Sequence, residues 1–315
     1  LLRPDVEPEL RQETDSGTYP AAEIFELLCR LDMRAFYRSW FELLDSYEIP
    51  YRLFDSSDLQ WRRLESQEEA LEIACGGSQE SYSESEVAAI LKRFRFEYQG
   101  IELPSGHRTT GDDRSASMEL VFAEDLAGKT VLDVGCAYGY FCFEAERRGA
   151  SCVTGTELKS HRFVGANVLR EVLGSDVRIL KQDIFAEGAE EEYDVVLLLN
   201  VLHHLPEPIK ALRTLGRLCR EKLIIEFPTL LDPKYGGTLG EVLPEEVNNL
   251  PLIGVSLPAE CDQYFLFTEA AIRRVLSDQV GGFMEIEILP SPMAPDRKIA
   301  VCRRSCGKRE AAARV

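Results

Sequence analysis

The strongest constraint on the fold is an alternation of apolar runs and helical patterns between residues 129 and 226. The runs VLDVG at 131–135 and YDVVLLLN at 193–200 are typical of buried strands. The second run is almost continuously apolar, as a strand must be when helices cover both faces of a parallel sheet. Strands that alternate with helices of this length predict a doubly wound α/β sheet.

The pattern predicts a Rossmann-like sheet of seven strands. Two late apolar runs, FMEIEILP and RKIAVCRR, are joined by the proline-rich SPMAPD, which predicts a hairpin and an antiparallel last strand. Three helical patterns, at 21–47, 58–74 and 85–95, predict a mostly helical N-terminal extension. We therefore expect four segments: a flexible leader at 1–20, a helical extension or cap at 21–100, an α/β domain at 101–315, and within it a lid insertion at about 227–267.

Charge and composition narrow the class of partner. The formal net charge of −18 opposes binding to nucleic acid, because neutralisation of phosphates supplies most non-specific affinity for such polyanions. No run approaches the roughly 20 apolar residues of a membrane-spanning helix. The nine cysteines are scattered and form no CxxC pair, so we expect reduced thiols and no metal site. Because the first residues, LLRPDVEPEL, are acidic and unlike a signal peptide, we expect a cytoplasmic location. A small-molecule partner is favoured; the oligomeric state is not indicated.

The turn after the first strand of the α/β domain has the sequence DVGCAYG. A dinucleotide site would have the pattern GxGxxG, but Ala137 and Tyr140 stand where its second and third glycines belong. A phosphate-binding P-loop would end in Gly-Lys-Ser/Thr, and that ending is missing. The pattern that remains is D-x-G-x-A-x-G, formed by Asp133, Gly135, Ala137 and Gly139.

This pattern resembles motif I of class I S-adenosylmethionine-dependent methyltransferases, whose usual form is (D/E)xGxGxG. The resemblance implies that small residues at Gly135, Ala137 and Gly139 let the backbone approach the methionine part of the cofactor. Asp133 would anchor the turn or hold the ammonium group through water. Alanine in place of the middle glycine implies a negative φ at Ala137.

Residues at three later strand ends extend the resemblance. Glu157 lies 24 residues after Asp133, where its carboxylate would accept both ribose hydroxyls. Asp183 would accept from the adenine amino group while Ile184 packs on the ring. Asn200 ends the fourth strand, at the sheet edge where open α/β sheets bind ligands. The cofactor implied by these matches is S-adenosyl-L-methionine.

The chain is most similar to the branch that includes the bacterial tRNA wobble-uridine carboxymethyltransferase and its small-molecule relatives. The similarity lies in IELPSGHRTTGDDRS, LAGKTVLDVGCAYGYFCFEAERRGA and NVLHHLPEP, over roughly residues 98–226. Within GDDRS, Arg114 is the single basic residue, and we expect it to pair with the methionine carboxylate. One basic group is poor support for a carboxylated cofactor, so ordinary S-adenosylmethionine is favoured.

Methyl transfer to oxygen or nitrogen needs alignment of the acceptor and removal of a proton. The chain has four histidines, and His203 and His204 follow the fourth strand beside the expected methyl position. Either could act as a base or only orient the acceptor, and Glu226 at the end of the fifth strand is another candidate. We expect a methyltransferase for a small organic acceptor, acting at oxygen. Two alternatives are a tRNA nucleoside (carboxy)methyltransferase and an inactive cofactor-binding scaffold.

Overall fold

A computed structural model of the chain describes residues 53–55, 60–62, 82–185, 191–230, 248–255 and 264–304. The chain divides into two compact units. The first unit comprises residues 1–96, 102–109 and 164–174, and the second comprises 97–101, 110–163 and 175–315. The predicted leader at 1–20 and most of the predicted extension at 21–100 lie outside the described residues.

The described part of the first unit contains a small hairpin, a helix, a short 3₁₀ turn and, from residues 164–174, most of helix α7 (Ser160–Leu173). Strands β1 (Leu53–Asp55) and β2 (Gln60–Arg62) pair antiparallel, with Phe54 opposite Trp61. The helix predicted over 58–74 is therefore wrong at its start, where an aromatic residue favours a strand. Helix α4 (Glu84–Arg93) confirms the third helical pattern, and Val87 and Ile90 on it are buried. A short 3₁₀ turn, η1 (Pro104–Gly106), follows later.

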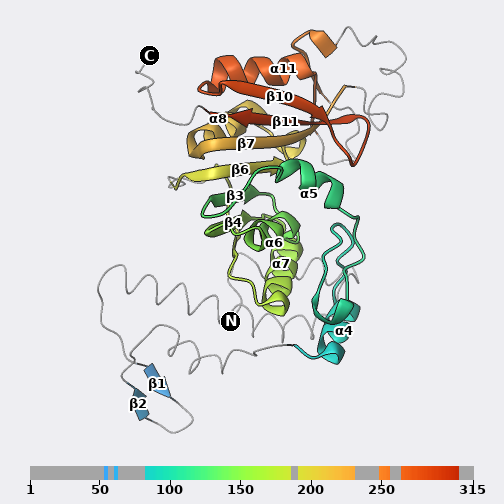
Figure 1. The fold of residues 1–315 in the computed structure, drawn as a ribbon, viewed down its shortest axis with the longest axis vertical. Coiled ribbons are helices and arrows are strands. Elements are labelled where there is room, and N and C mark those ends of the chain that lie inside the picture. The colour runs from blue at the N-terminus through green and yellow to red at the C-terminus, as the bar shows by residue number, and fades with distance from the viewer. Residues whose placement is uncertain are drawn as a thin grey trace. The chain divides into compact units, whose positions relative to one another are not determined.

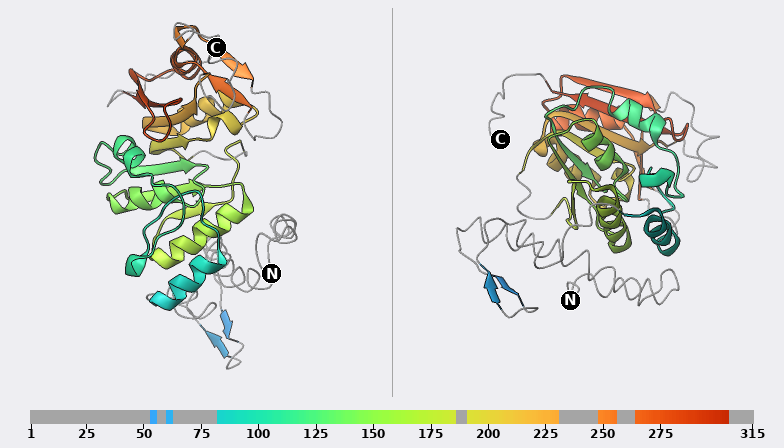
Figure 2. Two further views of the ribbon diagram at one scale, coloured as in Figure 1. Left: turned by 90° about the vertical axis from the view of Figure 1, so that its right-hand side faces the viewer. Right: turned by 60° about the horizontal axis from the view of Figure 1, so that its bottom comes forward.

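The second unit is built on a twisted sheet, seen from three sides in Figures 1 and 2. Within the described residues the sheet has seven strands in the order β10-β11-β7-β6-β3-β4-β5, and Figure 1 shows the first six of them stacked in this order. The neighbouring pairs from β7 to β5 are parallel, whereas β11 runs antiparallel to both β7 and β10. The strand bounds are Thr130–Val134 (β3), Cys152–Thr156 (β4), Arg178–Leu180 (β5), Tyr193–Leu199 (β6), Cys219–Pro228 (β7), Glu285–Pro290 (β10) and Arg297–Arg303 (β11). This arrangement confirms the predicted Rossmann-like sheet with an antiparallel last strand.

Helices connect the parallel strands. Helix α6 joins β3 to β4, and α8 joins β6 to β7. Because the chain moves from β3 toward one sheet edge and later from β6 toward the other, the strand order reverses between β3 and β6. The element bounds are Ser115–Val121 (α5), Tyr140–Arg147 (α6), Ser160–Leu173 (α7), Leu202–His204 (η2), Pro208–Leu218 (α8), Glu269–Arg274 (α11) and Val275–Val280 (η4, a π-helical turn).

Part of the predicted lid insertion at 227–267 is described. It contains the short antiparallel strands β8 (Ile253–Val255) and β9 (Phe265–Phe267). Residues 231–247 and 256–263 of the insertion lie outside the described residues. In the described part of the chain, no helix has both the length and the apolar character that crossing a bilayer requires.

The core lies on the two central strands. Val196, Leu197 and Leu198 of β6 and Leu223, Ile224 and Ile225 of β7 are all fully buried. Successive residues of a strand point to opposite faces, so burial of every residue means that both faces of the sheet are covered. The polar residues that follow these strands are thereby held on rigid backbone.

Gly155 in β4 provides a test of packing beneath the site. A Cβ atom at this position would lie 2.8 Å from the Cys142 sulfur, 2.9 Å from the Cys136 sulfur and 3.0 Å from Ile179 Cδ1. Gly155→Ala should therefore lower the free energy of unfolding by about 1–3 kcal/mol through overpacking. Urea denaturation of Gly155→Ala, Cys142→Ala and the double variant should show that removing the Cys142 sulfur restores part of the loss. Strictly additive effects of the two substitutions would contradict this packing.

Candidate active site

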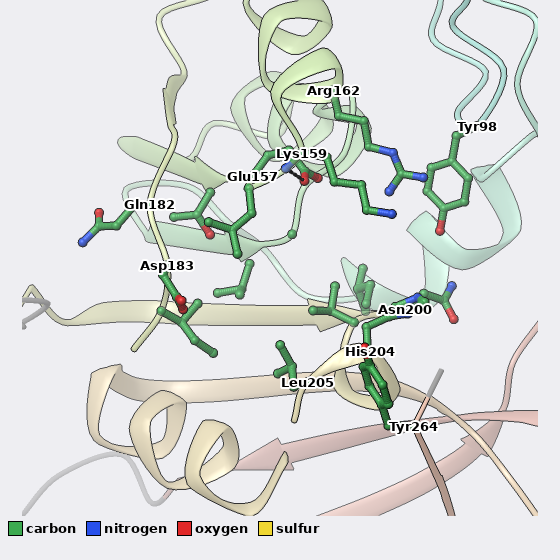
Figure 3. A pocket seen from close by; sticks show the side chains of 17 residues that line it. Tyr98, Glu157, Lys159, Arg162, Gln182, Asp183, Asn200, His204, Leu205 and Tyr264 are labelled. Atoms are coloured by element: carbon green, nitrogen blue, oxygen red, sulfur yellow. Dashed lines mark hydrogen bonds between the residues drawn. The ribbon is translucent and has the colours of Figure 1, made fainter. Parts of the chain in front are cut away.

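A cavity of about 320 Å³ opens at the carboxyl ends of β3, β4, β5 and β6. It lies at the reversal of strand order between β3 and β6, which is where open α/β sheets bind ligands. Figure 3 shows the side chains around it. The lining residues are Tyr98, Val134, Gly135, Thr156, Glu157, Leu158, Lys159, Arg162, Gln182, Asp183, Ile184, Leu199, Asn200, Val201, His204, Leu205 and Tyr264.

The turn after β3 brings backbone close to this cavity. Gly135 lines the cavity at φ +72°, and a Cβ atom there would lie 2.5 Å from Val201 Cγ2, so the position needs glycine. Gly139 precedes helix α6 at φ +90°, in the left-handed region. Ala137 and Gly139 do not line the cavity, so their part in the site is to shape the turn.

Ala137 corrects one expectation from the sequence. Its φ is +53°, not negative, although a left-handed conformation costs a residue with a Cβ atom about 1–2 kcal/mol. The Ala137 amide donates a hydrogen bond to Glu157 Oε2 at 3.0 Å, within a buried environment. A charge-assisted hydrogen bond of this kind offsets the conformational cost.

Glu157 ends β4 as predicted and is buried. Its Oε2 accepts from Ala137, and its Oε1 accepts from the Lys159 amide at 2.8 Å. Each carboxylate oxygen can accept a second hydrogen bond, so this side chain retains the capacity for the two predicted ribose hydroxyls. Asp183 and Ile184 line the same cavity, and Asp183 Oδ1 accepts from the Phe185 amide at 2.9 Å.

A second cavity, of about 20 Å³, shares Tyr98, Gly135, Leu199 and Asn200 with the first. Its volume is close to that of one water molecule. The charged residues that line it are Asp133, Arg114 and Glu226. The predicted acidic residue of the turn therefore lies beside, and not inside, the main cavity.

Arg114 is buried next to Tyr98. Its guanidinium carbon lies 4.7 Å from the centre of the Tyr98 ring, and Nη2 donates to the Tyr98 carbonyl at 3.3 Å. Nη2 also lies 3.7 Å from Asp112 Oδ2. Within the described part of the chain, the buried Nε atom has no hydrogen-bond partner. That unpaired donor fits the predicted role of Arg114 in holding a ligand carboxylate.

Asn200 and Glu226 belong to one hydrogen-bonded network. Asn200 Nδ2 donates to Glu226 Oε2 at 2.6 Å, and Arg297 Nη1 donates to Asn200 Oδ1. Ser291 Oγ donates to Glu226 Oε1. Burial raises the pKa of Glu226, and the hydrogen bond from Ser291 and the charges of Arg297 and Arg114 oppose that rise.

The two candidate histidines occupy different environments although their ring centres are 4.2 Å apart. His204 lines the main cavity, whereas His203 is 1% exposed and lines neither cavity. Burial, followed by the charges of His204 and Arg297, lowers the pKa of His203 to about 2. His203 therefore stays neutral and lies outside the cavity, and His204 is the histidine of the pair that faces the cavity.

Several residues at the site were missed in the sequence. Gln99 Oε1 accepts from the Tyr138 amide at 3.0 Å and from the Tyr140 amide at 3.3 Å, so it holds the start of α6. Nothing in the spacing of Tyr98 and Gln99 indicated that they reach the site. Lys159 and Arg162 had a usable signal, because they directly follow the strand end that carries Glu157.

Asp133 should make stability depend on pH. Burial, and to a smaller extent the nearby Glu157 charge, raises the pKa of Asp133 to about 7, although Cys142 Sγ donates to it at 3.6 Å. The unfolded chain releases this proton near pH 4, so between about pH 4 and 7 the folded state binds more protons than the unfolded state. The free energy of unfolding should fall over that range by on the order of 4 kcal/mol.

Asp133→Asn lacks this titration and provides the matched control. The difference in free energy of unfolding between wild type and Asp133→Asn, measured by urea denaturation from pH 5.5 to 8, should shift against the wild type as pH rises. A difference that stays constant over this range would mean that Asp133 is already ionised at pH 5.5.

Comparisons with known proteins identify the family of the chain. The chain is 29% identical over 109 residues to the ubiquinone biosynthesis O-methyltransferase of Neisseria meningitidis serogroup A, covering 34% of this chain and 46% of that protein. It is 37% identical over 97 residues to the enzyme of the same name from Pseudomonas paraeruginosa, covering 30% of this chain and 41% of that protein. The chain thus matches less than half the length of these curated relatives.

The fold has a counterpart among solved structures. The N-terminal domain of EvdMO1, solved with SAH bound, aligns with 72% of this chain and 99% of its own length at a TM-score of 0.54 and 19% identity. The family described as "Methyltransferase domain" matches residues 47–279, more than half of the 315 residues. The chain therefore belongs to this methyltransferase family, as its strand-end motifs predicted.

Proposed function

We propose that this chain is an S-adenosylmethionine-dependent methyltransferase that methylates a small organic acceptor at oxygen. The observation that carries the proposal is the single cavity that Gly135, Glu157 and Asp183 line together. These residues follow three different strands, and the class I resemblance gives them contacts with the methionine part, the ribose and the adenine. The glycine turn and the two strand-end carboxylates that line this cavity support the three contacts that the resemblance assigns.

The residues divide the work of methyl transfer. S-adenosylmethionine supplies, when bound, a methyl group on a positively charged sulfur. Glu157 accepts the ribose hydroxyls, Asp183 and Ile184 hold the adenine, and Arg114 holds the carboxylate. The Asn200–Glu226 pair fixes the end of β6, from which His204 extends into the cavity and removes the proton of the acceptor hydroxyl.

The choice of acceptor follows from relatives and charge. The two relatives above are named as O-methyltransferases of ubiquinone biosynthesis, which supports a small acceptor and transfer to oxygen. A tRNA acceptor stays an untested alternative, and the net charge of −18 opposes it. An inactive scaffold is distinguished by turnover, since it would bind cofactor without methyl transfer to any member of a broad acceptor panel.

Cofactor binding tests the proposal. Glu157→Gln loses the charge and one of two acceptor oxygens, and hydrogen bonds to charged groups are among the stronger ones. Isothermal titration calorimetry should show that S-adenosylhomocysteine binds the wild type, and that it binds Glu157→Gln about 10- to 100-fold more weakly. Glu146→Gln changes a carboxylate that lines neither cavity and accepts from the Asp176 amide, and this variant should bind like the wild type. Absence of binding to the wild type would overturn the proposed function.

The role of His204 separates chemistry from binding. With an acceptor identified from a hydroxylated panel, His204→Asn should lower kcat by about 10²- to 10⁴-fold, the usual contribution of a general base. The Kd for S-adenosylhomocysteine should change less than about twofold, because the cofactor contacts are elsewhere. A kcat within a few fold of the wild type would assign His204 a role in orientation only.

A further inference from the structure

The cavity is charged asymmetrically along its length. In Figure 3, the side chains of Lys159 and Arg162 extend toward Tyr98, at the end away from Gln182 and Asp183. Asn200 and His204 face this basic end from the other side of the cavity. Two cations in one cleft are notable in a chain of net charge −18, since chance placement favours carboxylates.

Arg162 is the stronger observation of the two. Its guanidinium carbon lies 4.8 Å from the centre of the Tyr98 ring, and its side chain is half-buried in the cavity wall. Among the residues that the structure describes, no carboxylate forms an ion pair with it. A guanidinium that is partly removed from water and stacked on an aromatic ring is pre-oriented for a planar anion.

Several other arginines of the same unit are paired with carboxylates. Arg147 pairs with Glu144, Arg220 with Glu192, and Arg303 with Glu124. Arg114 next to Tyr98 lies within 3.7 Å of Asp112. Arg162 differs from these in facing the cavity with its charge uncompensated within the described residues.

The proposed cofactor contacts do not involve Arg162. Under the proposed function, Glu157 and Asp183 hold the ribose and the adenine. The methionine carboxylate points toward Arg114, at the boundary where the two cavities share Tyr98 and Gly135. The basic end then faces the side from which the acceptor approaches, close to His204. We propose that the acceptor carries an anionic group, a carboxylate or a phosphate, which Arg162 binds bidentately with Lys159 adding positive charge. This inference rests on the proposed function and specifies its substrate class.

The inference has a measurable consequence for selectivity. Charge-assisted, bidentate hydrogen bonds favour an anion over a neutral analogue of the same shape. Loss of such a bond pair should reduce affinity by about 10- to 100-fold. The affinity for the acceptor should fall while the affinity for the cofactor stays the same. This difference distinguishes the proposal from a role of Arg162 in cofactor binding.

The experiment uses matched probes on the full chain saturated with S-adenosylhomocysteine. The carboxylate arm compares 4-hydroxybenzoate with 4-hydroxybenzamide, and the phosphate arm compares phenyl phosphate with phenol, by ligand-observed NMR titration. At least one anion should bind about 10-fold or more tightly than its neutral partner, and the arm that succeeds identifies the anion. Arg162→Gln should remove the preference, and Arg162→Lys should restore part of it. Arg147→Gln, which changes an exposed arginine paired with Glu144, should keep it.

Three results would overturn the inference. The first is that the neutral probes bind as tightly as the anions. The second is that neither anion binds at 10 mM when S-adenosylhomocysteine is in place. The third is that Arg162→Gln weakens the binding of S-adenosylhomocysteine by as much as it weakens the binding of the anion. Thermal denaturation of each variant shows whether it is folded. If Arg162→Gln is not folded, the affinity for the anion is compared between the wild type and Arg162→Lys. Failure of the wild type to bind S-adenosylhomocysteine is a separate result that removes the proposed function itself.

Discussion

The carboxylate of Glu157 is the contact that holds the site together. One of its oxygens accepts from the Ala137 amide in the turn after β3, and the other accepts from the Lys159 amide just beyond β4. Parallel strands align their ends at one sheet edge, but they do not fix the loops that follow. This carboxylate fixes two loops at once, and it keeps Ala137 in the left-handed conformation that the turn requires. The group proposed to bind ribose is therefore also the group that shapes the turn beside it.

The antiparallel strand β11 has a comparable role on the other side of β6. Arg297 at its start donates to Asn200, and Asn200 donates to Glu226 at the end of β7. Asn200 has φ +60°, a conformation that asparagine tolerates better than most residues. Because the network spans β6, β7 and β11, the final hairpin of the chain helps to orient the segment from which His204 reaches the cavity. A purely parallel sheet of five strands would lack this support.

The apolar runs and the turn residues between them predicted the parallel sheet and its late hairpin. They also predicted that Glu157, Asp183, Ile184 and Asn200 lie at strand ends. These features are local, because a buried strand needs a continuous apolar run and its end needs a polar residue. The φ of Ala137 could not be predicted, since the carboxylate that sustains it is 20 residues away. The strand at Gln60–Arg62 was taken for helix because three residues within a helical spacing carry little signal.

The histidine pair shows the same limit of sequence reasoning at the level of single side chains. His203 and His204 are adjacent, and only the 3₁₀ turn η2 decides which imidazole is buried and which faces the cavity. The position of Arg162 shortly after Glu157 could be noticed in the sequence, but its contact with the Tyr98 ring could not, because Tyr98 lies more than 60 residues earlier.

Burial of acids beside the cavity gives the apoprotein a cost that ligand binding can relieve. Asp133 is removed from water with one weak donor, the Cys142 thiol, and the Glu157 charge opposes its ionisation. A positively charged ligand group in the adjoining space would stabilise the ionised carboxylate and lower its pKa, since an opposite charge favours the charged form. Selection for tight binding of a cationic ligand thus conflicts locally with selection for stability. The buried central residues of β6 and β7 lie away from the cavity and supply stability that offsets the cost of such a site.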